Sequence, residues 1–238
     1  MFDFAGLWTK AQDNIIFLLV CLLVFVGLFV VALLLERLWL KPPKQSEARR
    51  VAYIGIFSAI AAVLMYLDFS LPFAPSFYTI DFSEVPVLIC SFSLGPVAGV
   101  VCEFVKILIK LVIKGTSTFF VGEFANFVVG CTLVLPATII YHRFKSKKGA
   151  LVGMITGTVI FAAFGSFFNA VYLLPTFAGM FGGFDKIYAM STAINPAMNS
   201  VSAIALMAVV PFNIVKGTVV SILTYLLYKH IERLFRMR

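Results

Sequence analysis

A run of 22 residues without a charge, from Asn14 to Leu35, constrains this chain more than any other feature. A transmembrane helix needs about 20 consecutive apolar residues, so the run is long enough to cross a bilayer. A signal peptide has a basic segment and a shorter apolar core. Here Lys10 is offset by Asp3 and Asp13, and Arg37 follows the run. The run therefore predicts a membrane helix.

The remainder of the chain is apolar enough to predict several further spans. Apolar residues make up 61% of the 238 residues and charged residues 13%, against about a half and a quarter in soluble domains. A compact globule of this size cannot hide that excess, which excludes a secreted domain, a soluble enzyme and a disordered tail. The long unbroken runs also lack the alternation of β-barrel strands. We therefore expect an all-α, polytopic helical membrane protein.

Three short basic segments indicate how the spans are oriented. The net charge is +8, and 13 of the 19 Lys and Arg residues lie in residues 37–50, 143–148 and 229–238, each beside an apolar run. Lys and Arg concentrate in the cytoplasmic loops of membrane proteins. The segments therefore predict three cytoplasmic loops or ends, and no surface for nucleic acid.

The basic segments also decide how often the apolar stretch 85–114 crosses the membrane. It is either one long helix or two helices broken at Gly95-Pro96. One crossing would leave the second and third basic segments outside, whereas two crossings place all three inside, as the positive-inside rule favours. Proline lacks a backbone N–H and disfavours helix in the preceding residue, which suits a turn. The first of the two helices is then short and must tilt or be shielded by its neighbours.

The expected result is one N-terminal helix followed by six spans. The N-terminal helix covers residues 14–35. The six spans cover residues 51–67, the two parts of 85–114, 117–141, 149–175 and 195–228. The N-terminus then lies outside and the C-terminus inside the cell. We expect two parts, residues 1–48 with the N-terminal helix and a basic linker, and residues 49–238 with a six-helix membrane domain.

Polar side chains at a similar depth mark a candidate site. From a rise of ~1.5 Å per residue, three helices bring polar groups to the outer third of the membrane: Asn126 with Glu123, Asn169, and Asn213 with Lys216. A single amide is readily explained as an interhelical contact worth ~1 kcal/mol or less. The set at one depth favours a binding pocket open to the outside. Lys216 could donate to a ligand or pair with Glu123, and the sequence leaves both open.

Proline supports a cavity near these amides. Pro211 frees the backbone carbonyl of Met207. Irregular backbone at membrane depth usually faces a cavity.

Two further patterns have two readings each. Four aromatic residues of the loop 68–84 could cover a flat aromatic ligand or form an interfacial belt: Phe73, Phe77, Tyr78 and Phe82. Four charged residues are spaced for one helix face: Glu103, Lys106, Lys110 and Lys114. Glu103 and Lys106 could pair, and we expect the other two lysines to extend outward to the membrane surface.

Small residues on the span 51–67 predict a close helix contact. They form the pairs Gly55-x-x-x-Ala59 and Ser58-x-x-x-Ala62. Small residues at this spacing let helices approach closely, either in a docking face for another protein or in internal packing.

Motifs for catalysis and nucleotide hydrolysis are absent from the sequence. It contains no G-x-x-x-x-G-K-[ST], no H-E-x-x-H and no G-x-S-x-G. His142 and His230 lie in or beside basic segments, far from the amides. The four cysteines lie in apolar runs without C-x-x-C spacing, so we expect neither disulfides nor a metal site: Cys21, Cys90, Cys102 and Cys131. We therefore expect a protein that is not an enzyme and has no cofactor.

Four segments resemble the riboflavin-specific substrate-binding subunits, or S components, of energy-coupling factor (ECF) transporters. They are Phe77-Tyr-Thr-Ile-Asp-Phe-Ser-Glu-Val-Pro86, Leu94-Gly-Pro-Val-Ala-Gly99, Gly122-Glu-Phe-Ala-Asn-Phe127 and Pro211-Phe-Asn-Ile-Val-Lys-Gly217. The resemblance runs from about Arg49 to the C-terminus. It implies a six-helix S-component core that binds riboflavin near the outer surface of a bacterial cell membrane. The extra N-terminal transmembrane helix departs from this pattern.

The resemblance implies partners as well as a ligand. It implies that a coupling transmembrane subunit and a pair of ABC-type ATPases drive riboflavin uptake. It also implies that small residues on the first core helix face the coupling subunit: Gly55, Ala59 and Ala62.

The resemblance assigns the pocket to residues already singled out. It implicates Asn169, Asn213 and Lys216 most strongly, then Glu123 and Asn126, with Phe77 and Tyr78 as cover. The flat ring and hydroxyl-rich tail of riboflavin suit aromatic cover and a few convergent amides. The alternatives are the same architecture with another vitamin, and a membrane enzyme or structural membrane protein.

Overall fold

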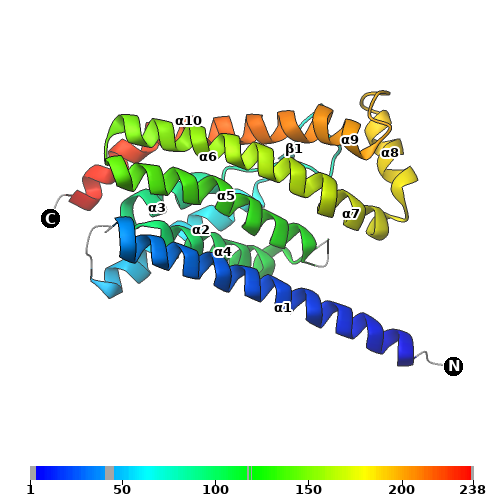
Figure 1. The fold of residues 1–238 in the computed structure, drawn as a ribbon, viewed down its shortest axis with the longest axis horizontal. Coiled ribbons are helices and arrows are strands. Elements are labelled where there is room, and N and C mark those ends of the chain that lie inside the picture. The colour runs from blue at the N-terminus through cyan, green and yellow to red at the C-terminus, as the bar shows by residue number, and fades with distance from the viewer. Residues whose placement is uncertain (1–3, 41–45, 117, 119, 237–238) are drawn as a thin grey trace.

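The computed structural model describes the backbone of residues 4–40, 46–116, 118 and 120–236. Within these ranges it describes side chains only from Leu19 to Tyr228. In this part of the chain, seven helical rods run along the long axis of one elongated bundle (Figure 1). Five of the helical segments are long and apolar enough to cross a membrane. The expectation of an all-α, polytopic fold is confirmed.

The rods alternate in direction along the bundle (Figure 1). They are α1 (Phe4–Leu35) with the π-helix η1 (Glu36–Leu40); α2 (Glu47–Tyr66); α3 (Glu84–Leu94); α4 (Pro96–Lys114); α5 (Val121–Phe144); α6 (Lys147–Phe168) with η2 (Asn169–Leu173) and α7 (Leu174–Phe181); and α9 (Val201–Ile204) with η3 (Ala205–Val209) and α10 (Val210–Arg236). A short hairpin of β1 (Phe69–Ser70) and β2 (Thr79–Ile80) joins α2 to α3. The short helix α8 (Phe184–Thr192) follows α7.

The stretch 85–114 consists of two helices, as predicted. Helix α3 has 11 residues and ends before Gly95, whose φ of 103° lies in the region that favours glycine. Pro96 is the first residue of α4. At this position a backbone N–H has no partner inside the helix, so the N–H that proline lacks is not needed. The short α3 is shielded by its neighbours, because nearly all of its side chains are buried.

Two connections differ from the sequence expectation. The final rod begins at Val201 rather than at residue 195. Pro196 disfavours helix in the residue before it, and Ser200 caps the helix by accepting a hydrogen bond from the backbone N–H of Ala203. The β-hairpin and α8 were not predicted, since both are short and lie in loops rich in aromatic and small residues.

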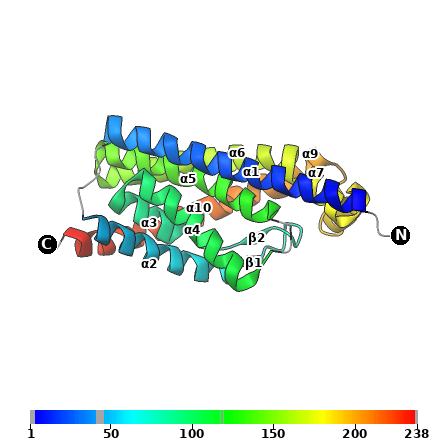
Figure 2. The ribbon, with the colours of Figure 1, turned by 90° about the horizontal axis from the view of Figure 1, so that it is seen from below.

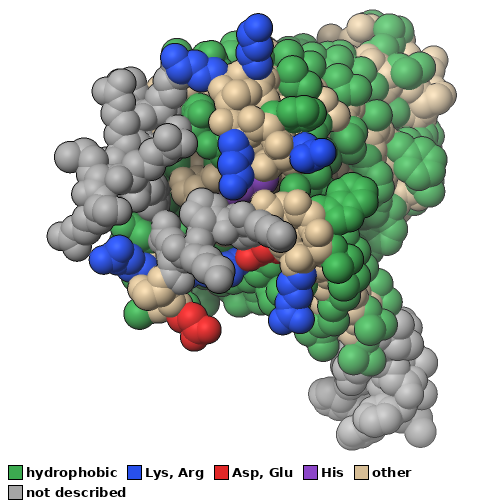
Figure 3. Space-filling view, turned by 60° about the vertical axis from the view of Figure 1, so that its left-hand side comes forward, with side chains coloured by type: hydrophobic (Ala, Val, Ile, Leu, Met, Phe, Trp, Pro, Cys, Tyr) green, Lys and Arg blue, Asp and Glu red, His purple; other side chains and the backbone are tan. Residues whose placement is uncertain are grey.

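The three basic segments lie at one end of the bundle. The end of η1, the start of α2, the α5–α6 connection and the end of α10 are all at the left in Figure 1, opposite the start of α1. Figure 3 shows Lys and Arg side chains gathered on this face, which we call the basic end. The side chains of residues 41–45 and 229–238, His230 among them, lie outside the described part. The described chain therefore runs the length of the bundle an odd number of times, because the start of α1 and the end of α10 lie at opposite ends.

The N-terminal helix packs lengthwise on the bundle (Figure 2). The Phe25 ring stacks on Phe104 of α4, with centroids 4.0 Å apart, and contacts Phe127 of α5. At the basic end, Glu36 accepts a hydrogen bond from the first turn of α4, at Val97 N, and forms an ion pair with Arg50 at 2.8 Å. Polar and aromatic contacts thus fix α1 against α4 and α5.

Helices α5 and α6 approach closely where α6 has glycines. A Cβ on Gly157 would lie 2.6 Å from the backbone oxygen of Leu133. We expect Gly157→Ala to lower stability by ~1–3 kcal/mol, because the backbones must separate to relieve the overlap. Thermal unfolding in detergent measures this. Gly27→Ala is the control, since a Cβ there meets nothing within 4 Å; equal melting of both variants would contradict the packing.

Candidate functional site

Six of the seven predicted pocket residues line one cavity of about 120 Å³: Phe77, Tyr78, Asn126, Asn169, Asn213 and Lys216. The cavity lies between the loop after β1, α5, the α6–η2–α7 rod and α10. Asn169 lies roughly 33 Å along the rod that begins with Lys147 at the basic end. The cavity is thus remote from the basic end, as the depth argument predicts.

Irregular helix geometry positions Asn169 at the cavity. Asn169 is the first residue of the π-helix η2, and π turns inside α-helices occur frequently at functional sites. Its side-chain oxygen accepts a hydrogen bond from the hydroxyl of Tyr78. This contact ties the loop after β1 to the α6–η2–α7 rod and closes one side of the cavity.

Helix α10 contributes Asn213 and Lys216, which are three residues apart and share a face. Asn213 Nδ2 donates to Ser166 Oγ on α6 at 3.2 Å. The π-helix η3 directly precedes this part of the rod, so the irregular backbone predicted near Pro211 is confirmed. Two of the three rods that bring amides to the cavity therefore contain a π turn beside it.

Two acidic residues hold Lys216, and neither is Glu123. Lys216 Nζ donates to Asp81 Oδ2 at 2.9 Å and lies 3.7 Å from Glu84 Oε2. All three residues are 5% exposed or less. Burial opposes the charge on Asp81, but Lys216 and Lys106 lower the pKa of its carboxyl to about 2. Asp81 therefore stays ionised at physiological pH and keeps the lysine in place.

The prediction that Glu123 belongs to the cavity is wrong in this structure. Glu123 forms an ion pair with Lys110 and accepts a hydrogen bond from Thr116 at 2.9 Å. It sits in the first turn of α5, where its side chain reaches Lys110 of α4. Lys110 is therefore paired with an acidic residue, whereas we expected its side chain to extend unpaired to the membrane surface. Lys114 also pairs, with Asp68.

Aromatic rings form part of the cavity wall. Phe77 and Tyr78 line it, with ring centroids 4.5 Å apart, and Phe177 and Phe212 join them. Phe77 also contacts Phe177 edge-on at 5.8 Å. Two of the four predicted loop aromatics are thus at the cavity. Phe212 could have been found as the neighbour of Asn213, whereas nothing in the sequence singled out Phe177.

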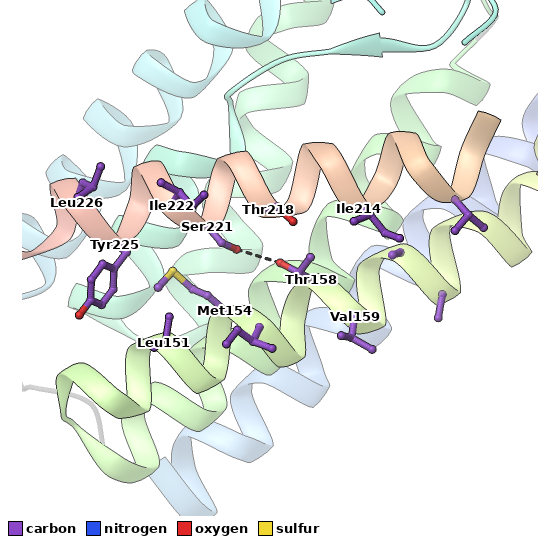
Figure 4. Close-up of a pocket in the computed structure, with 14 residues that line it drawn as sticks. Leu151, Met154, Thr158, Val159, Ile214, Thr218, Ser221, Ile222, Tyr225 and Leu226 are labelled. Carbon is purple, nitrogen blue, oxygen red and sulfur yellow. Dashed lines mark hydrogen bonds between the residues drawn. The ribbon is translucent and has the colours of Figure 1, made fainter. Parts of the chain in front are cut away.

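A larger hollow of about 670 Å³ lies on the face between α6 and α10 (Figure 4). Its lining is almost entirely apolar, and Figure 4 shows one polar contact across it, between Thr158 and Ser221 at 3.0 Å. Val159 and Leu226 in its wall are more than half exposed. Ligand pockets combine apolar walls with a few convergent polar groups, so the smaller cavity is the candidate site.

The small residues of α2 do not share one face. Gly55 and Ala59 are exposed, and a Cβ on Gly55 meets nothing within 4 Å. Ala62 is 1% exposed and packs inside the bundle, as does Ser58, which donates to the backbone of Cys102 on α4. The prediction that Ala62 faces a partner is therefore wrong, because α2 packs on α3 and α4 along that side.

Comparisons with known proteins agree with this geometry. Residues 49–228 match the family model of ECF transporter substrate-specific components. The chain is 35% identical over 190 residues to the riboflavin transporter RibU of Staphylococcus aureus (strain TCH60), covering 80% of this chain and 94% of that protein. It is 30% identical over 183 residues to the riboflavin transporter FmnP of Bacillus subtilis (strain 168), covering 76% and 91%.

A solved structure shares the fold. It is the S component of a bacterial ECF transporter, with a TM-score of 0.62 and 36% sequence identity. The similarity covers 81% of this chain and all of the solved chain.

Proposed function

We propose that this chain, which belongs to the family of ECF transporter substrate-specific components, captures riboflavin at the outer face of a bacterial membrane for ATP-driven uptake. The observation that carries the proposal is the convergence of Asn169, Asn213 and Lys216 with aromatic rings around one buried cavity. The names of the relatives support riboflavin as the ligand. The same comparisons disfavour an enzyme.

The cavity chemistry suits both halves of riboflavin. Phe77, Tyr78 and Phe177 offer apolar surface to the flat ring. The amides and Lys216 can donate hydrogen bonds to ring acceptors or to the hydroxyl-rich tail. Pockets for ligands of this size measure ~300–1,000 Å³. The cavity is smaller than this, so we expect the loop carrying Phe77 and Tyr78 to move when riboflavin enters, with loss of the contact between Tyr78 and Asn169.

The test is binding by the purified protein without any partner. Riboflavin fluorescence should be quenched on titration with the protein in detergent, and protein isolated from cells should be yellow with a flavin absorption spectrum. Thiamine and biotin, offered at the same concentrations, should not displace the flavin. If the protein binds another vitamin tightly and does not bind riboflavin, that vitamin is the ligand of the same architecture.

The orientation of the chain is part of the proposal. We infer that the N-terminus lies outside and that the basic end is cytoplasmic, because Lys and Arg favour that side. Residues 49–238 then form the riboflavin-binding domain, and residues 1–48 add the outer terminus, one helix and a basic linker.

Cysteine labelling tests this orientation. In a background without the native cysteines, a reagent that cannot cross membranes should modify a cysteine placed at residue 3 of intact cells. It should spare cysteines at residues 146 and 236 until the membrane is permeabilised. Labelling of the cysteine at residue 146 in intact cells would show that the basic end lies outside, which contradicts the proposed orientation.

A further inference from the structure

A cluster of buried charges lies behind the wall of the candidate site. It contains three carboxylates and two ammonium groups, bridged by one hydroxyl: Asp81, Glu84, Glu103, Lys106, Lys216 and Ser83. We call these six residues the ion cluster. Each of them is 5% exposed or less. Glu84 and Lys216 line the cavity, whereas Glu103 and Lys106 lie outside its lining.

Two of the three carboxyl groups have donors on both oxygens. Asp81 accepts from the backbone N–H of Ser83 at 2.9 Å and from Lys216 at 2.9 Å. Glu84 accepts from Ser83 Oγ at 3.0 Å and from Lys106 at 3.2 Å. Hydrogen bonds to both oxygens favour the ionised form of a carboxyl group. Asp81 and Glu84 are therefore each paired with one of the two lysines and with one further donor.

Glu103 is in a different position. Its Oε1 forms an ion pair with Lys106 Nζ at 2.7 Å, and no other donor reaches either of its oxygens in the described part of the chain. Lys106 also donates hydrogen bonds to Ser83 and Glu84, so Glu103 shares its one cationic partner with two other acceptors. The backbone of α5 closes the other side, because a Cβ on Gly130 would lie 2.2 Å from Glu103 Oε1. A carboxylate here would be both buried and poorly solvated.

The charge count of the ion cluster is uneven. With every group ionised, three negative charges face two positive charges, which leaves a net charge of −1. An uncompensated buried charge is expensive, and such a group usually takes up a proton instead. The other titratable group beside Glu103 is the Cys131 thiol of α5, which supplies no positive charge. The pair of Lys110 and Glu123 is balanced by itself.

We infer that Glu103 is a proton-binding site, occupied at neutral pH, which makes the ion cluster electrically neutral. With Glu103 protonated, the charge of Lys106 balances that of Glu84, and the charge of Lys216 balances that of Asp81 at the cavity. A glutamine at residue 103 has the same shape and lacks the charge, so it reproduces the protonated state. Glu123, which has lysine and hydroxyl donors, is the matched position for comparison.

Infrared spectroscopy of the full-length protein in detergent tests this inference. The parent at neutral pH should show a carboxylic acid C=O band that shifts in D₂O and disappears in Glu103→Gln. The matched variant Glu123→Gln should keep the band. Glu103→Gln should also keep the thermal midpoint and the riboflavin affinity of the parent, while Glu123→Gln, which leaves Lys110 without its partner, should unfold at a lower temperature.

Three results would overturn the proton site. The band could persist in Glu103→Gln, Glu103→Gln could misfold or melt below Glu123→Gln, or Na⁺ could stabilise the parent in the absence of an acid band. The last result would make a metal cation the balancing charge. None of these readouts depends on riboflavin being the ligand, so failure of the proposed function would leave them intact.

Discussion

Lys216→Met should weaken riboflavin binding and strongly destabilise the protein. Lys216 is 5% exposed and is the ion-pair partner of Asp81. Removing one member of a buried pair typically costs ~3–5 kcal/mol, because the other charge remains without compensation. Losing a donor to the ligand costs a further ~1–3 kcal/mol, or roughly 5- to 150-fold in affinity. Fluorescence titration and thermal unfolding in detergent measure the two effects.

A double variant separates the structural effect from the binding effect. Asp81→Asn with Lys216→Met removes both charges of the pair, so stability should recover relative to the single variant. Riboflavin affinity should stay low, because no ammonium is returned to the cavity. If the double variant binds like the parent, Lys216 only supports the fold.

Asn213 provides a milder comparison on the same helix face. Its partner is the neutral hydroxyl of Ser166, so Asn213→Ala leaves no buried charge behind. We expect a folded protein whose riboflavin affinity falls by roughly 5- to 150-fold. Lys110→Ala should change affinity little, since Lys110 does not line the cavity. Parental affinity in both Asn213→Ala and Lys216→Met would assign the polar side chains to helix packing.

The depth of the site was predictable because helix geometry is regular. A constant rise per residue converts the spacing from a basic segment into height, which placed Asn126, Asn169 and Asn213 correctly around one cavity. The turn at Gly95-Pro96 was inferred in another way, from the number of crossings that places all three basic segments on one side of the membrane. These predictions needed no knowledge of which helices are neighbours.

Side-chain partners could not be predicted in the same way. Asp81 reaches Lys216 across 135 residues, through a hairpin whose path depends on tertiary packing. Glu123 has the right height for Lys216 but faces Lys110, because height does not fix the direction of a side chain around its helix. Ala62 illustrates the same limit, since its burial depends on where α3 and α4 lie.

One signal for the acidic partners was present in the sequence. A lysine at membrane depth requires a counter-charge, and Glu123 was the candidate at similar height. Asp81 stands in the loop that precedes α3 and Glu84 is the first residue of α3, places that a search confined to the middle of the spans overlooks. Loops that fold back into a bundle therefore belong among the candidates for pairing with intramembrane lysines.

Ala59→Leu should reduce riboflavin uptake to background while leaving riboflavin binding intact. The chain carries no P-loop, so we expect accumulation of the vitamin only in the presence of the coupling subunit and its ATPases. Ala59 and Gly55 form an exposed stretch of α2 with small side chains, which permits close approach of another helix. A leucine blocks that approach without touching the cavity, whose lining contains no α2 residue.

A matched substitution on another lipid-facing helix isolates the contact. Ala163 of α6 is also exposed, and Ala163→Leu adds the same bulk on a different helix, so uptake should stay at the parental level. Uptake of labelled riboflavin by cells that supply the ATPase module, and binding to the purified variants, give the two readouts. Loss of binding in Ala59→Leu would show that Ala59 supports the fold, and normal uptake would place the coupling contact on another helix. Because Ala62 packs inside the bundle, its enlargement would impair folding and binding together, which makes Ala59 the position where transport and binding can be separated.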